Sequence, residues 1–108
     1  MDQDKALEAV RFLAERLKES AVQVSRVVLF GSHARGDASE ESDLDVVIVS
    51  ESFRGKNIFE RSRLAGEPER DTMRRYNVPL DVIFMTPEEY ESETSLLAHV
   101  AKTAGVEA

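Results

Sequence analysis

Three aspartates occupy positions where a strand normally carries an apolar residue or ends. Asp43 and Asp45 lie two residues apart at the entry to the apolar run 44–49, and Asp81 lies near the start of a second run, 80–85. Side chains at i and i+2 of a strand point to the same face, so the three carboxylates converge if the two strands are neighbours. Grouped carboxylates repel one another unless a cation neutralises them, and Mg²⁺ is the hard ion that prefers such oxygen ligands. The competing interpretation is that Asp43 caps a turn and that Asp45 and Asp81 are exposed edge-strand residues.

A second group of residues favours binding of an anion. Phe30-Gly31-Ser32 follows an apolar strand and opens what we expect to be a short helical turn over residues 32–35. Glycine lets backbone N–H groups approach an anion closely, the Ser32 hydroxyl adds a donor, and a helix N-terminus favours negative charge. Arg35 can add a planar, permanently charged fork to the same phosphates. Taken alone, Gly31-Ser32 is equally typical of an ordinary turn.

Together these residues form a spaced pattern: Gly31-Ser32, ten intervening residues, Asp43-x-Asp45, and Asp81 further on. The pattern resembles the signature of the DNA polymerase beta nucleotidyltransferase superfamily. The full run 31–45, GSHARGDASEESDLD, is similar to the minimal nucleotidyltransferases (MNT) of bacteria and archaea, and the resemblance covers essentially the whole chain. It implies an α+β (α/β) fold with a small mixed sheet flanked by helices, in which 1–108 form a single domain.

The resemblance also implies a site and a reaction. Gly31, Ser32 and Arg35 would hold the phosphates of ATP, while the carboxylates of Asp43, Asp45 and Asp81 would hold Mg²⁺ and act in catalysis. AMP would pass to a hydroxyl with release of pyrophosphate, with Asp81 as a candidate acceptor of the hydroxyl proton. The family commonly occurs beside a HEPN protein, so the expected partner is a HEPN-type toxin and the chain its antitoxin.

Three other functions remain open at this point. One is a binding module that neutralises its partner by contact, although a degenerate enzyme has no reason to keep three mutually repelling acids. Another is the small subunit of an antibiotic-type, small-molecule nucleotidyltransferase, and the third is a metal-binding domain without transferase activity. The histidines do not decide between them: we interpret His33 as a loop side chain and His99 as a helix-surface or core-edge residue.

Composition limits the classes of protein. The chain has 108 residues, of which 42% are apolar, and this suits one small domain. Its net charge of −7 argues against general affinity for nucleic acid or for anionic membranes. It has no cysteine, which excludes disulfides and thiolate chemistry. The absence of an apolar leader or membrane span predicts a cytoplasmic protein. Residues 31–53 carry one Arg against six acids, and residues 54–75 carry seven bases against four acids, which we interpret as solvated faces.

The elements that must position these residues follow from periodicity. The pattern predicts helices over 2–20 and 94–103 and strands over 26–30, 44–49 and 80–85, with a loop over 36–42. Residues 56–76 are expected to form two helices separated by a break at Gly66-Glu67-Pro68. Thr86-Pro87 is typical of the start of another helix. This order of helices and strands predicts an α+β domain with a small sheet.

Overall fold

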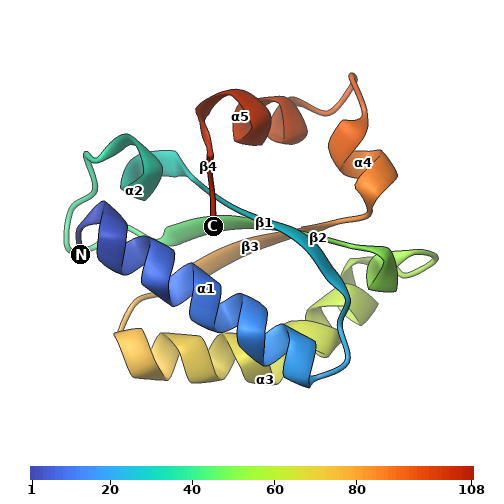
Figure 1. Ribbon diagram of the computed structural model, residues 1–108, viewed down its shortest axis with the longest axis horizontal. Helices are drawn as coiled ribbons and strands as arrows, with labels where there is room; N and C mark the ends of the chain where they lie inside the picture. Colours follow the sequence, from blue (N-terminus) through green and yellow to red (C-terminus); the bar gives the residue numbers. More distant parts are fainter.

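A four-stranded mixed sheet forms the centre of the molecule. The computed structural model describes all 108 residues, and its strands lie in the order β3-β2-β1-β4. β1 (Val24–Phe30) and β2 (Leu44–Ser50) are antiparallel, β2 and β3 (Leu80–Met85) are parallel, and β4 (Val106–Glu107) is antiparallel to β1. Helices cover both faces of this sheet (Figure 1). The predicted α+β class with a small mixed sheet is confirmed.

The larger core lies between the sheet and the helices α1 (Gln3–Glu19) and α3 (Ile58–Tyr76). α1 begins where the Asp2 side chain accepts a hydrogen bond from the Lys5 N–H at 2.8 Å. Its apolar stripe, represented by the fully buried Leu13 and Leu17, packs on the side chains that alternate residues of β1 and β2 send to this face. α1 and α3 lie side by side beneath the sheet in Figure 1.

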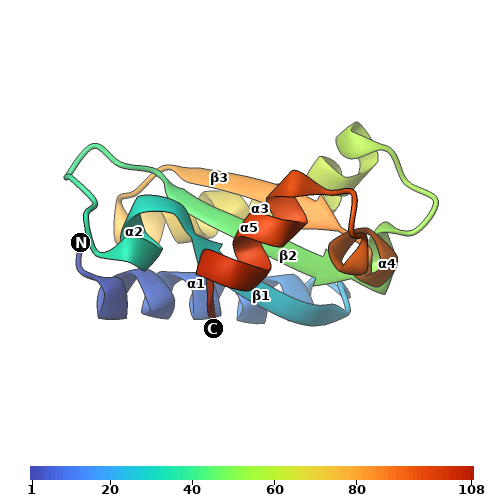
Figure 2. The same ribbon diagram turned by 90° about the horizontal axis from the view of Figure 1, so that it is seen from above.

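A smaller core lies on the opposite face. Here α4 (Pro87–Glu91) and α5 (Leu96–Ala104) supply Tyr90, Ala98 and Ala101, which cover Val28 of β1 and the outward residues of β2. α5 lies across the sheet when the molecule is seen from above (Figure 2). The predicted helix start at Thr86 is confirmed, since Thr86 and Glu89 form a capping box. α2 (Gly31–Arg35) completes this layer at one end of the sheet.

The predicted break at Gly66-Glu67-Pro68 is wrong, because α3 is one continuous helix with Pro68 inside it. A proline removes one helical N–H donor and normally breaks a helix, but tertiary packing can override that preference. Pro68 is fully buried, and its carbonyl accepts a second hydrogen bond from the Thr72 hydroxyl at 2.8 Å. Ala65 also belongs to the main core, and Asp71 pairs with Arg16 of α1. Contacts with the core and with α1 therefore stabilise α3 on both sides of Pro68.

Two further differences concern the C-terminal end of the chain. The last helix begins at Leu96, capped by Ser95, rather than at 94. β4 was not predicted, because two residues are too short for alternation of apolar and polar side chains to be recognised. It pairs with Val28 and Leu29 of β1.

No helix of the structure is both long enough and apolar enough to pass through a bilayer.

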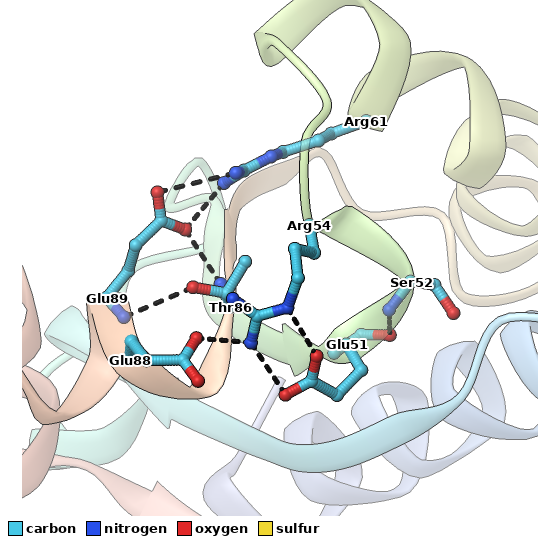
Figure 3. A network of polar contacts seen from close by, with 8 residues as sticks. Glu51, Ser52, Arg54, Arg61, Thr86, Glu88 and Glu89 are labelled. Carbon is cyan, nitrogen blue, oxygen red and sulfur yellow. Dashed lines mark hydrogen bonds and ion pairs between the residues drawn. The ribbon is translucent and has the colours of Figure 1, made fainter.

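Paired charges connect the elements at the end of the sheet where β2 finishes (Figure 3). The 3₁₀ turn η1 (Glu51–Phe53) follows β2, and Arg54 binds both Glu51, at 2.8 Å, and Glu88 of α4. Arg61 of α3 donates to the Phe84 carbonyl at 3.0 Å and to Glu89 at 2.7 Å. Side-chain exposure of Arg61 is only 14%, so this pair is better shielded from water than an ordinary surface pair. The network joins α3 and α4 across β3.

The main core should dominate stability. Leu29→Ala removes a side chain with no exposed surface from β1, and we expect a loss of about 2–5 kcal/mol in the free energy of unfolding. Leu96→Ala is the matched control, because Leu96 is 76% exposed and its truncation should change stability by less than about 0.5 kcal/mol. Urea denaturation measures both. Equal losses in the two variants would contradict the assignment of the core.

Candidate functional site

The register of the parallel strands places Asp45 of β2 directly beside Asp81 of β3. The prediction that these two strands are neighbours in the sheet is confirmed. β2 is a central strand and Asp45 is half-buried, so the interpretation of Asp45 as an edge residue is wrong; Asp81 is exposed on the edge strand β3. Asp43 is exposed and immediately precedes β2. None of the three carboxylates makes a hydrogen bond or an ion pair within the chain, so Asp43 does not cap a turn with its side chain.

The electrostatics of Asp45 reflect this crowding. Burial is the largest cause that raises the pKa of Asp45, and the negative charges of Asp81 and Asp43 raise it further. His33 and Arg35 act in the opposite direction. The charge of Asp45 is therefore only partly compensated by the protein, and its carboxylate favours an added cation.

Gly31 brings the two halves of the sequence pattern into contact. Its φ of +74° lies in the left-handed region, and a Cβ built on it would lie 2.2 Å from Oδ2 of Asp45. Phe30, the last residue of β1, pairs with Asp45 in the antiparallel register. The Asp45 carboxylate thus packs against the backbone at the start of α2, and only glycine leaves room for it.

The remaining predicted anion ligands lie on α2. The predicted helical turn is confirmed, with Ser32 half-buried in its first turn and Arg35 exposed at its end. Nε of Arg35 donates to Asp37 Oδ2 at 3.2 Å, and both side chains are more than half exposed. Such a surface pair contributes little and can rearrange. Figure 1 shows α2 above the end of the sheet where β2 and β3 begin.

His33 differs from the sequence interpretation. It is not a loop side chain but belongs to α2 and is 2% exposed, and its Nδ1 lies 3.1 Å from the Asp43 carbonyl oxygen. A single imidazole within a polar, glycine-containing stretch carries no periodic signal of burial, so sequence reasoning could not place it. His99 is exposed on α5, as one of its two interpretations required.

The donor chemistry of the three carboxylates suits a hard divalent cation. Their oxygens are free of internal partners, and they share one end of the sheet. Although the two strands are neighbours, the predicted convergence of all three carboxylates is wrong, because no three Asp, Glu or His side chains lie closely enough to hold a metal ion together. Mg²⁺ commonly takes only one or two carboxylates and completes its shell with water and substrate phosphates, so these residues fit it.

The family of the chain follows from comparison with known proteins. Residues 8–102 match the nucleotidyltransferase domain family, and the chain belongs to that family. Two proteins of Methanocaldococcus jannaschii, both provisionally named protein adenylyltransferases, are similar over shorter stretches. MJ0604 is 40% identical over 52 residues, which is 47% of this chain and 49% of that protein. MJ0141 is 63% identical over 27 residues, or 25% of this chain and 27% of that protein. The matches thus span at most about half of these relatives.

Solved structures share the fold. A provisionally assigned nucleotidyltransferase from Sulfolobus solfataricus superposes with a TM-score of 0.69 at 24% identity, covering 97% of this chain and 80% of that one. A structure described as a minimal nucleotidyltransferase gives 0.62 at 22% identity, with 98% and 95% covered. A toxin–antitoxin complex, MntA–HpeT, gives 0.62 at 14% identity, with 99% and 72% covered. These likenesses establish the nucleotidyltransferase fold.

The contact between Gly31 and Asp45 can be tested against a glycine of the same backbone conformation. Gly31→Ala and Gly55→Ala both place alanine at a φ near +74° or +73°, and each should cost about 1–2 kcal/mol of stability. Only Gly31→Ala also forces the Asp45 carboxylate to move, since a Cβ at Gly55 meets nothing within 4 Å. The Asp45 carboxyl ¹³C resonance should therefore shift in Gly31→Ala alone. An unchanged resonance would contradict the contact.

The raised pKa of Asp45 predicts that its charged carboxylate destabilises the folded protein at neutral pH. Because the folded protein binds this proton more tightly, stability falls as pH rises from the ordinary value of 3.8 through the raised one. Asp45→Asn lacks the charge, so its melting temperature should exceed that of the wild type at about pH 7, and the difference should vanish below about pH 3. Glu40→Gln, in the exposed loop before β2, is the control. A less stable Asp45→Asn at neutral pH would contradict the prediction.

Proposed function

We propose that this protein is a Mg²⁺-dependent nucleotidyltransferase that transfers AMP from ATP to a hydroxyl on a partner protein. The partner we propose is a HEPN-type toxin, with this chain as its antitoxin. The observation that carries the proposal is the register of Asp45 beside Asp81, with the Gly31 backbone packed on the same carboxylate. The residues that we propose to bind phosphate thus lie at the same end of the sheet as the acids.

Each residue has a distinct part in this reaction. The backbone at Gly31, the Ser32 hydroxyl and the Arg35 guanidinium bind the triphosphate. Asp43, Asp45 and Asp81 would hold Mg²⁺, which neutralises the phosphates and lowers the pKa of the attacking hydroxyl when bound. The hydroxyl oxygen forms a bond to the α-phosphorus, and the bond from that phosphorus to the oxygen bridging the α- and β-phosphates breaks. Pyrophosphate leaves with that electron pair.

Asp81 is the best placed of the acids to accept the proton of the hydroxyl. It is exposed on the edge strand, whereas Asp45 is half-buried between two strands. A general base must lie within hydrogen-bond reach of the proton that it takes, and an edge position admits an acceptor carried by a large partner. The openness of the Asp81 side of the site supports a protein acceptor.

The comparisons support the same proposal. The two Methanocaldococcus jannaschii relatives bear the name of protein adenylyltransferases, and one toxin–antitoxin structure of the same fold was determined with AMP-PNP, an ATP analogue. A contact-only antitoxin is the alternative. It is favoured by the four apolar side chains that α3 and α5 expose near their first residues, Ile58, Phe59, Leu96 and Leu97.

Label transfer tests the proposal. The protein, its co-expressed partner, Mg²⁺ and ATP labelled on the α-phosphate are combined, and wild type is compared with Asp43→Asn and Glu40→Gln. Removing one Mg²⁺ ligand forfeits several kcal/mol of charge stabilisation, so Asp43→Asn should label the partner at least about 100-fold more slowly. Glu40→Gln removes an exposed acid of the same loop and should keep the wild-type rate.

Two outcomes would overturn the proposal. If the partner stays bound and neutralised but no label moves, the protein acts by contact. If label moves equally well in Asp43→Asn, transfer does not depend on the acids named here.

A further inference from the structure

Asp43 differs from the other two acids in how its backbone is held. Asp45 lies within β2 and is paired in register with Phe30 on one side and Asp81 on the other. Asp81 is likewise held by the ladder of β3 on β2. Asp43 precedes β2, so no strand register fixes it. Its position must be set by something else.

The loop before Asp43 is tied mainly to itself. Ser42 N donates to the Ser39 carbonyl at 3.2 Å, and Ser39 N donates to the Ser42 hydroxyl at 3.0 Å. At its beginning, Asp37 N donates to the Ser32 carbonyl at 3.1 Å. These contacts shape the loop locally but do not connect Asp43 to the body of the protein.

Two hydrogen bonds fix the peptide group that joins Asp43 to Leu44. The Leu44 N–H donates to the Pro79 carbonyl at 2.9 Å, and the Asp43 carbonyl lies 3.1 Å from Nδ1 of His33. One bond comes from the turn before β3 and the other from α2. The same peptide group is therefore held at both ends, and the Asp43 Cα with it.

The chemistry of this contact defines the state of the imidazole. A carbonyl oxygen only accepts, so Nδ1 of His33 must carry the proton. His33 is 2% exposed, and this burial shields the hydrogen bond from water. Nε2 makes no hydrogen bond within the chain, and the structure leaves no buried side-chain nitrogen or oxygen without a partner. His33 borders a small hollow of about 190 Å³ beside Ser39, Ser42 and Asn77.

We propose that His33 is a positioning residue, which donates from Nδ1 to the Asp43 carbonyl and thereby holds the Asp43 carboxylate in place for the divalent cation. This inference rests on the proposed function, because it assigns Asp43 as a cation ligand. His33 itself touches neither cation nor nucleotide. Removal of such a supporting partner typically weakens metal affinity by 10- to 100-fold.

The test compares His33→Leu with His33→Asn. Leucine fills much of the buried volume without a donor, whereas the amide nitrogen of asparagine can occupy the place of Nδ1. Mn²⁺ is the probe, because it accepts the same octahedral oxygen ligands as Mg²⁺ and its binding is measured by electron paramagnetic resonance without nucleotide or partner. We expect the Kd for Mn²⁺ to rise about 10-fold or more in His33→Leu and less than about threefold in His33→Asn.

Melting temperatures show whether the variants fold. Wild-type affinity for Mn²⁺ in a folded His33→Leu would overturn the inference, and so would equal weakening in the two variants, since burial rather than the hydrogen bond would then be responsible. Wild-type protein that binds no Mn²⁺ would overturn it as well.

The transferase reaction and the positioning role of His33 are tested independently of each other. If wild type binds Mn²⁺ and His33→Leu does not, but no label reaches the partner, the positioning role stands and the transferase reaction does not. If label is transferred and His33→Leu behaves as wild type in both assays, the reaction stands and the positioning role falls.

A second measurement needs no cation. Long-range ¹H–¹⁵N NMR at about pH 8.5, where an ordinary imidazole is neutral, distinguishes the two ring tautomers of His33. The structure requires the Nδ1–H tautomer. Observation of the Nε2–H tautomer would overturn the inference directly.

Discussion

The pairing of β2 with β1 on one side and β3 on the other is the constraint on which the rest of the structure depends. Val46 and Ile48 point into the core between the sheet and the helices α1 and α3, so Asp45 must point to the opposite face. A slip of one residue would turn the Asp45 carboxylate into the larger core and move Val46 and Ile48 onto the face that α4 and α5 cover. The free energy that fixes the core therefore also fixes the acid beside Asp81, and the site needs no separate device to set that register.

Charged side chains are paired at one end of the sheet and unpaired at the other. Where β2 finishes, Arg54 and Arg61 are matched by the acids of η1 and α4, and their charges are neutralised within the chain (Figure 3). Where β2 begins, three carboxylates have no partner, and burial and mutual repulsion raise the pKa of Asp45. The charge of Asp45, which His33 and Arg35 compensate only in part, lowers stability unless a ligand neutralises it, and this is typical of a binding site rather than of a structural one.

The basic segment 54–75 is mostly exposed, as interpreted from the sequence, but two of its bases make contacts that its composition did not indicate. We interpreted these bases as solvated faces, yet Arg61 is largely buried and bonds to a strand carbonyl. Arg75 lies over the rings of Phe12 and Tyr76, where its guanidinium covers apolar surface. Arg61 and Arg75 therefore contact other elements of this chain, whereas Arg63, Arg70 and Arg74 are exposed, as the interpretation of a solvated face required.

The sequence alone predicted most of the elements and which residues form the candidate site. Alternating and continuous apolar runs specified three strands, and the spacing of Gly31, Asp43 and Asp45 specified which side chains could meet, because strand and turn geometry act over a few residues. Only the tertiary structure decided what depends on contacts between distant segments. Packing keeps α3 helical through Pro68, pairing makes a strand of β4, and burial converts His33 from a loop residue into the partner of Asp43. Such contacts leave no periodic trace in the chain, since they join residues whose separation is set by the fold and not by the repeat of a helix or a strand.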